Sequence, residues 1–179
     1  MRVLSMDVSR RLYTAAVSAV CLTIILGCIV AHDSYAATAK EIDVSVDVAL
    51  ERFHKEVAGA KEFLKGAKGV LVFPSVYKAG IVVGGEYGEG ALRVGGKTVD
   101  YYSTVAGSWG LQLGAQKKTV IHVFMQEEAL KNFRNSQGWK AGIDGSVALV
   151  TVGAGGSIDT TKIKDPIVGF VFGQKGLMY

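Results

Sequence analysis

Two short segments of this 179-residue chain carry residue types that catalysis uses. Gly96-Lys97-Thr98 resembles the end of a phosphate-binding loop, in which backbone amides and a lysine hold the phosphates of a nucleotide. That loop needs a glycine five positions before Gly96 and a helix after it. The sequence has Ala91 there, and a strand pattern follows. We therefore expect a hairpin turn at Gly95-Gly96-Lys97 and no nucleotide site.

The second segment is Gly107-Ser108-Trp109-Gly110, a near match to the nucleophile elbow of serine hydrolases. Ala106 stands where the first glycine belongs, and a catalytic triad would have to recruit His54 or His122. The carboxylates of the glycine-rich region lack the spacing of a calcium or zinc site. They are Glu86, Glu89, Asp144, Asp159 and Asp165. We expect no catalytic residue, no metal and no cofactor.

A stronger signal comes from Val46–Ala67, where apolar residues recur at steps of four and three. This spacing predicts an amphipathic helix with one apolar stripe. The stripe is Val46, Leu50, Phe53, Val57, Ala60, Leu64 and Ala67. Ser45 is the expected N-cap, and Gly59 marks a bend or a close contact. The basic residues of the helix and its C-terminal end are Arg52, Lys55, Lys61, Lys65 and Lys68.

Two arrangements of this helix fit the pattern. The stripe (Leu50, Phe53, Val57 and Leu64 above all) packs on the sheet of its own domain, or it inserts into a membrane. In both, the basic side chains can face anionic lipid headgroups, where each lysine contributes about 1 kcal/mol. This interpretation requires them to share one surface and to be free of neutralising carboxylates. Two pairs, Glu51/Lys55 and Arg52/Glu56, have the spacing of ion pairs across one helical turn.

From Gly69 onward the pattern changes to strands with glycine-rich turns. We expect strands at 70–73, 80–85, 91–94, 98–104, 108–116, 119–124, 141–153 and 167–172. The expected turns include 84–90, Lys117-Lys118 and 173–176, and a short helix is expected at Glu127–Asn135. The fold class is therefore α+β: an N-terminal amphipathic helix packed on a curved, mainly antiparallel, glycine-rich β-sheet or small barrel, with one further short helix.

The first 36 residues have the anatomy of a cleaved export signal. Arg2, Arg10 and Arg11 form a basic start, a run of apolar residues covers Ala15–Ala31, and Ser34-Tyr35-Ala36 offers a signal-peptidase site. We expect residues 1–36 to be removed and the protein to be periplasmic, peripherally associated with a membrane. The alternative is a lipoprotein acylated at Cys28.

Composition limits the partners. The chain is 49% hydrophobic and 20% charged, with a formal net charge of +4. Without residues 1–36, which hold three basic and two acidic residues, the charge is +3. Nucleic-acid binders usually carry dense clusters of lysine and arginine, so we expect no nucleic-acid partner. A mild positive charge is compatible with an anionic membrane surface.

Ordered matches over Ala49–Tyr179 resemble the SYLF domain family. The matching segments are 68–74, 78–80, 84–92, 108–116, 129–130, 138–139, 153–156 and 176–178. The resemblance implies a lipid-binding module, of the exported bacterial type when combined with the leader. Eukaryotic relatives bind phosphoinositides, partly through an N-terminal amphipathic helix, and some bind actin. An exported protein would not meet actin in its own compartment.

By position, the resemblance gives Arg52, Lys55, Lys61 and Lys65 a headgroup role. We therefore expect residues 37–179 to form a single, non-enzymatic SYLF-like domain that contacts anionic or phosphorylated lipid headgroups. The alternative is a structural or protein-interaction domain of the cell envelope whose helix packs internally. The family pattern continues past 176–178 with another strand, and the sequence leaves open whether the chain ends naturally at Tyr179 or is truncated.

Overall fold

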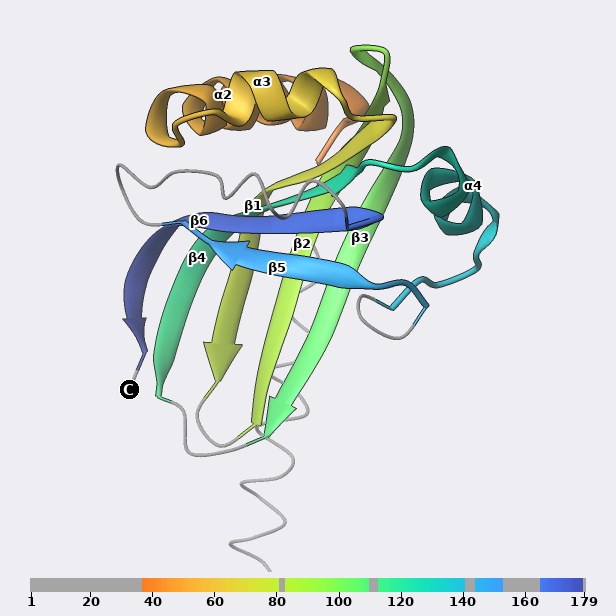
Figure 1. Ribbon diagram of the computed structural model, residues 1–179. Helices are drawn as coiled ribbons and strands as arrows, with labels where there is room; N and C mark the ends of the chain where they lie inside the picture. The colour runs from red at the N-terminus through yellow and green to blue at the C-terminus, as the bar shows by residue number, and fades with distance from the viewer. Residues whose placement is uncertain (1–36, 81–82, 110–112, 141–143, 153–164, 179) are drawn as a thin grey trace, which may run out of the picture. The chain divides into compact units, whose positions relative to one another are not determined.

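The chain from Ala37 onward builds an open β-sheet with helices on both of its faces (Figure 1). The computed structural model describes residues 37–80, 83–109, 113–140, 144–152 and 165–178. The predicted export signal and Cys28 lie outside these residues. The elements, in chain order, are α2 (Ala39–Glu56), α3 (Ala60–Lys65), β1 (Gly69–Gly80), β2 (Val83–Val94), β3 (Lys97–Trp109), β4 (Gly114–Phe124), α4 (Glu127–Asn135), β5 (Val147–Thr151) and β6 (Ile167–Met178).

The sheet has the strand order β3-β2-β1-β4-β6-β5, with β3 and β5 as its edges. Neighbouring strands are antiparallel except β5 and β6, which are parallel. Figure 1 shows β6 running across the top of the sheet and then bending downward beside β4. The predicted α+β class with a curved, mainly antiparallel sheet is confirmed. Of the two arrangements expected, the open sheet is the one observed.

The predicted single helix is two helices. Helix α2 begins seven residues earlier than expected, because Thr38 and not Ser45 is its N-cap. The Thr38 side chain accepts from the Glu41 backbone N–H, and the Glu41 carboxylate accepts from the Thr38 N–H at 2.7 Å, which makes a capping box. The helix stops after Glu56, and Gly59 (φ 81°) supplies the left-handed residue between α2 and α3.

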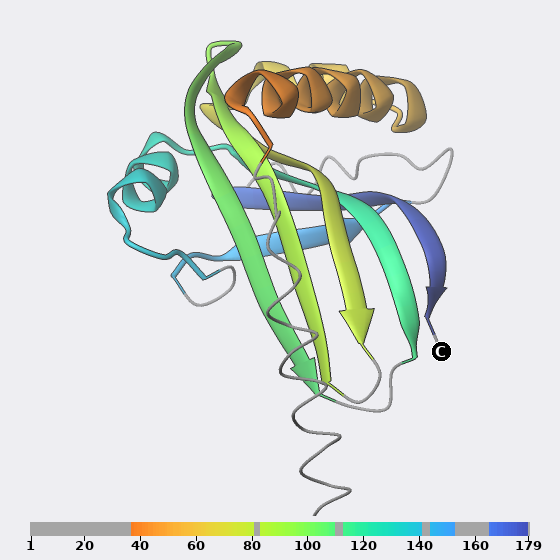
Figure 2. The ribbon, with the colours of Figure 1, turned by 180° about the vertical axis from the view of Figure 1, so that it is seen from behind.

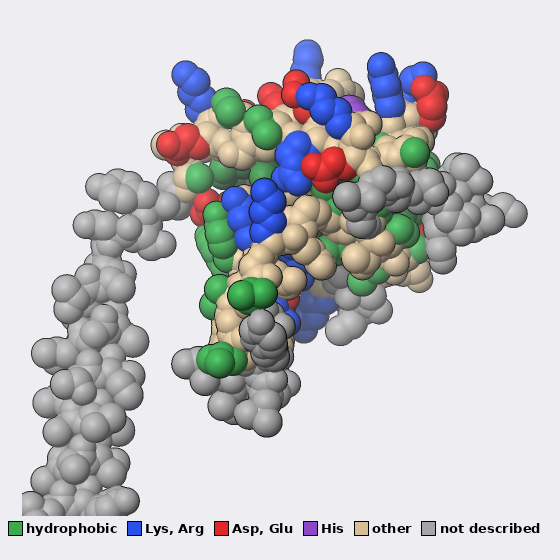
Figure 3. Space-filling model, turned by 90° about the vertical axis from the view of Figure 1, so that its left-hand side faces the viewer, with side chains coloured by type: hydrophobic (Ala, Val, Ile, Leu, Met, Phe, Trp, Pro, Cys, Tyr) green, Lys and Arg blue, Asp and Glu red, His purple; other side chains and the backbone are tan. Residues whose placement is uncertain are grey.

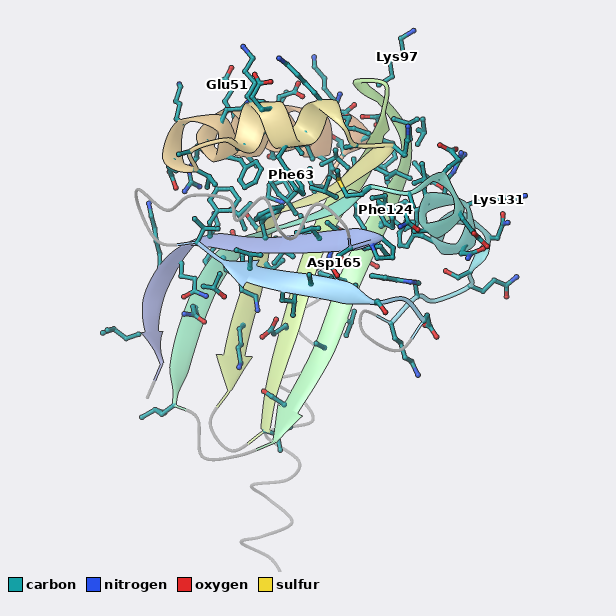
Figure 4. The ribbon with its side chains drawn as sticks, in the orientation of Figure 1. Glu51, Phe63, Lys97, Phe124, Lys131 and Asp165 are labelled. Carbon is teal, nitrogen blue, oxygen red and sulfur yellow. The ribbon has the colours of Figure 1, made fainter. Side chains whose placement is uncertain are left out.

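The apolar stripe of α2 and α3 faces the sheet. The Phe53 ring lies 5.0 Å from the Phe170 ring and 5.4 Å from the Phe172 ring, and Phe63 meets Phe170 edge-on at 5.5 Å. Val57 is buried in the same cluster, and Leu50 and Leu64 pack against it half-buried. Figure 2 shows both helices lying across the upper part of the sheet, and Figure 4 shows Phe63 pointing down into it. Internal packing is thus the arrangement adopted by the stripe.

The opposite face of the sheet holds a second core beneath α4. Leu130 and Phe133 of α4 pack there with Leu71, Phe124 and Ile167. The sequence predicted α4 with its correct bounds and with Leu130 and Phe133 inward, and this prediction is confirmed. The hairpin turn is confirmed as well: Gly95 and Gly96 have φ 57° and 79°, and Val94 pairs with Lys97.

The strands are longer than the sequence predicted, so three expected turns are wrong. The glycine-rich segment 84–90 lies inside β2, Lys117-Lys118 lies inside β4, and 173–176 lies inside β6. Strand β1 also continues past Pro74, where the register shifts against both neighbours. A proline is accepted in a central strand only at such a bulge, because it has no N–H for the ladder. The expected strand 108–116 is divided between β3 and β4, and residues 110–112 lie outside the described ones.

Candidate functional site

The five predicted basic residues do not share one surface. Arg52 faces the β6 side of α2, where its guanidinium lies 5.6 Å from the centre of the Phe172 ring. Its Nε donates to Glu56 Oε1 at 3.1 Å, which is the ion pair predicted from the spacing. Lys55 lies 3.9 Å from Glu51 on the exposed side of α2, the second predicted pair. Arg52 and Lys55 are therefore each accompanied by a carboxylate one turn away.

The other three basic residues line one groove. Lys61, Lys65 and Lys68 come from α3 and the segment after it, and α2 contributes His54 on the opposite wall. The third wall is the β2–β3 turn with Gly95 and Gly96. This basic groove has a volume of about 440 Å³. The helices bring the lysines together because α3 folds back beside α2 at Gly59.

Charge in the basic groove is predominantly positive. Lys65 Nζ is 2.8 Å from Glu62, in a pair whose two side chains are both exposed. Exposed pairs of this kind are worth about 0–1 kcal/mol, so an incoming anion competes with the carboxylate. Lys61 and Lys68 have no carboxylate within ion-pair distance among the described residues. The requirement for cations free of neutralising carboxylates is thus met by Lys61 and Lys68, in part by Lys65, and not by Arg52 or Lys55.

Arg93 of β2 is a fourth cation of the basic groove, and the sequence analysis missed it. Its side chain is 15% exposed and crosses to α2, where Nη2 lies 2.8 Å from Asp47 and 3.5 Å from Asp43. The Nε atom is buried without a partner. Asp47 is the one carboxylate among the residues that line the groove. No local signal in the sequence marks Arg93, because its neighbours on α2 lie 46 and 50 residues away.

The first segment considered for catalysis makes a structural contact. Thr98 donates to Asp43 at 2.6 Å, so Gly96-Lys97-Thr98 ties the hairpin to α2. His122 is buried in the sheet, whereas His54 lines the basic groove. Glu86 lies 2.8 Å from Lys118 and 3.8 Å from Lys78. Across the ranges that the structure describes, no group of three or more potential ligands could hold a metal ion.

Comparison with known proteins finds one family model that matches the C-terminal part of the chain. The model of the Ysc84 family, described as Las17-binding protein actin regulator, matches residues 105–178. Residues 105–178 belong to a Ysc84 (SYLF) domain. No significant match was found among the curated proteins.

The SYLF match runs from the second half of β3 through β6 and includes α4. It confirms the family that the sequence resembles. The family is associated with lipid binding and actin binding. The basic groove, between residues 47 and 96, precedes the matched segment. Within the described residues, no helix of the protein is long and apolar enough to cross a membrane.

Proposed function

We propose that this SYLF protein is a non-enzymatic lipid-binding module that contacts anionic or phosphorylated headgroups through the basic groove. The observation that supports the proposal is the gathering of Lys61, Lys65 and Lys68 around one hollow, whose single lining carboxylate, Asp47, is already paired with Arg93. Ammonium and guanidinium groups are the donors that proteins use for phosphate. The sequence predicted lipid contact along one basic helix, which the structure divides into α2 and α3. The proposal restricts the lipid contact to α3 and the segment after it.

Attachment by this route is electrostatic. Phe53 and Val57 of the apolar stripe are buried against the sheet, and Leu50 is half-buried, so little of the stripe is free to insert into acyl chains. Each lysine close to an anionic surface contributes about 1 kcal/mol, and three or four together give weak binding that salt opposes. Figure 3 shows Lys and Arg side chains (blue) along the upper rim, interspersed with Asp and Glu side chains (red).

Co-sedimentation with vesicles tests the proposal. Vesicles of phosphatidylcholine with an added anionic phospholipid should pellet the protein at low salt, and phosphatidylcholine alone should not. The double variant Lys61→Glu/Lys68→Glu should weaken the partition by at least about 30-fold, because two contacts of about 1 kcal/mol are lost. Lys131→Glu/Lys175→Glu is the matched control, since it changes charge equally on α4 and β6, away from the groove. Equal loss in both variants would contradict the site.

A second candidate function is a structural or protein-interaction domain of the cell envelope. Three of the five predicted headgroup residues (Arg52, Lys55 and Lys65) pair with carboxylates, and this favours a solvated helix surface. The family description names protein partners in actin regulation. Indifference to anionic vesicles together with a stable partner recovered from the envelope would favour this candidate.

We also propose that the protein is exported and peripherally attached to the membrane. The proposal rests on the basic start, the apolar run and the small residues of the first 36 positions. Mass spectrometry of the mature N-terminus distinguishes cleavage after Ala36 from acylation at Cys28. In that compartment actin is not a partner. Sedimentation with filamentous actin, which we expect to be negative, tests this part separately.

A further inference from the structure

A second pocket lies on the opposite face of the sheet from the basic groove, between β3 and α4. Its volume is about 430 Å³, within the range of small-molecule sites. Four aromatic side chains line it: Phe73, Tyr102, Phe133 and Trp139. Lys140 is the one charged side chain among the lining residues. The pocket is therefore apolar for most of its surface, unlike the basic groove.

One polar side chain is buried in this apolar pocket. His122 of β4 lines the pocket and is 9% exposed. Its ring stands edge-on to Trp139 at 5.8 Å and to Phe73 at 6.4 Å. Burial lowers the pKa of His122 to about 4, so the imidazole is neutral at pH 7. The Nδ1 atom is buried and has no hydrogen-bond partner.

The surroundings of Nδ1 decide which nitrogen carries the proton. Nδ1 faces β6, where a Cβ atom placed on Gly169 would come within 3.3 Å of it. A buried N–H without an acceptor is costly, so the tautomer with the proton on Nε2 is favoured. Because Nδ1 is closed off and the residue lines the pocket, the ring edge that carries Nε2 is the one that meets a ligand. His122 thus offers the pocket one neutral donor.

We propose that this pocket binds a single-chain amphiphile, whose alkyl chain fills the aromatic walls and whose carbonyl oxygen accepts from His122 Nε2. An acyl ester fits this chemistry, because it combines a long apolar body with one uncharged acceptor. A phosphate does not suit the buried end of the pocket at His122, where it would meet a neutral imidazole and aromatic rings, because Lys140, the one charged lining residue, is exposed. The proposal is independent of headgroup binding at the basic groove.

Fluorescence gives a direct test. The sequence has two tryptophans, so in a Trp109→Phe background Trp139 alone reports on the pocket. We expect 1-monolauroylglycerol, added below its micelle concentration, to change this fluorescence in a saturable way. The nitrogen resonance of His122 Nε2 in the same titration should shift, and this second measurement needs no variant. A fluorescence response that does not saturate, or an unmoved imidazole resonance, would overturn the proposal.

Two variants place the ligand. Ala106 is an exposed lining residue of edge strand β3, so Ala106→Phe should fill the pocket and weaken binding at least tenfold. Gly107→Phe is its matched control, since Gly107 is the next residue, does not line the pocket and has open space around it. His122→Leu should weaken binding about fivefold by removing one donor. If Ala106→Phe or His122→Leu bound 1-monolauroylglycerol as tightly as the parent protein does, the assignment would be refuted. Lys61→Glu/Lys68→Glu should bind the probe normally, which separates this site from the groove.

Discussion

Arg93 Nη2 of β2 lies 2.8 Å from Asp47 Oδ1 of α2, and the same nitrogen donates to the Asp43 backbone carbonyl at 3.3 Å. One guanidinium therefore fastens the N-terminal half of α2 to the sheet beside the β2–β3 turn. Asp43 also accepts from the hydroxyls of Thr98 (2.6 Å) and Tyr101 (3.0 Å), both on β3. These contacts hold α2 and the β2–β3 turn, which are two walls of the basic groove, in position relative to each other.

We expect Arg93→Met to lower the free energy of unfolding by about 1 kcal/mol, because hydrogen bonds to a largely exposed carboxylate are worth little more than neutral ones. The buried Nε without a partner makes the loss smaller still. Urea unfolding at pH 7 measures it. Lys97→Met is the control, since Lys97 points away from the molecule at the tip of the hairpin (Figure 4). Equal destabilisation by both variants would show that Arg93 does not fasten α2.

The Asp43 contacts predict a dependence on acid. The hydrogen bond from Thr98, then that from Tyr101 and the charge of Arg93, hold the pKa of the Asp43 carboxyl below its usual 3.8. Its stabilising effect is therefore complete above that value and is lost as the pH falls through the lower pKa of the folded state. Asp43→Asn should unfold at less urea than the parent at pH 6, and the two should converge only as the pH falls below 3.8. Glu51→Gln on the outer side of α2 should show no such convergence.

His122 predicts a second, separate pH window. Burial lowers its pKa from 6.5 to about 4, so between these values the unfolded chain takes up a proton that the folded protein refuses. Stability should fall as the pH drops from 6.5 to 4, by about 3 kcal/mol from this residue. His122→Leu should flatten this part of the urea profile and cost little at pH 7, where Nδ1 already lacks a partner. A profile with the parent's slope in the variant would contradict the assignment.

The apolar stripe predicts a large packing effect. Phe53 is fully buried against Phe170 and Phe172, so Phe53→Ala should lower the free energy of unfolding by about 3–5 kcal/mol. Val48→Ala, on the same helix but 54% exposed, should change it by less than about 0.5 kcal/mol. Thermal and urea unfolding measure both. If Phe53→Ala lowered the free energy of unfolding as little as Val48→Ala, the packing of the stripe on the sheet would not be what stabilises the fold.

The features that the sequence predicted correctly have strong local signals. The spacing of Leu130 and Phe133 located α4, and two adjacent glycines located the turn at Gly95-Gly96. The apolar stripe was correct in its inward face, although α2 starts at Thr38, whose capping box with Glu41 is itself visible in the sequence. Arg93 was missed because its role exists only after β2 pairs with β1 beneath α2.

Two of the three wrong turns, 84–90 and 173–176, are segments rich in glycine, whereas Lys117-Lys118 has none. The glycines of 84–90 were interpreted as a source of turns, whereas in β2 Gly88 and Gly90 leave room where β1 comes close. In β6, Gly176 is needed for both reasons: its φ is 115°, and a Cβ atom there would be 2.2 Å from the Ala115 carbonyl oxygen. A single sequence does not distinguish a glycine needed for its φ from one needed for its size, because the neighbour that requires the space lies on another strand.

The glycines of β2 allow this reasoning to be tested. The register of β1 against β2 shifts between Val72 and Ser75, and a Cβ atom at Gly90 would lie 2.0 Å from the Val72 carbonyl oxygen. Gly90→Ala must therefore displace backbone, and we expect a loss of at least about 3 kcal/mol in the free energy of unfolding. Gly85 lies in the same strand with nothing within 4 Å of a Cβ atom, so Gly85→Ala should be neutral or stabilise by about 0.5 kcal/mol. Urea unfolding of the two variants compares an identical chemical change at two positions. If both were tolerated, steric need would not explain why β2 is rich in glycine.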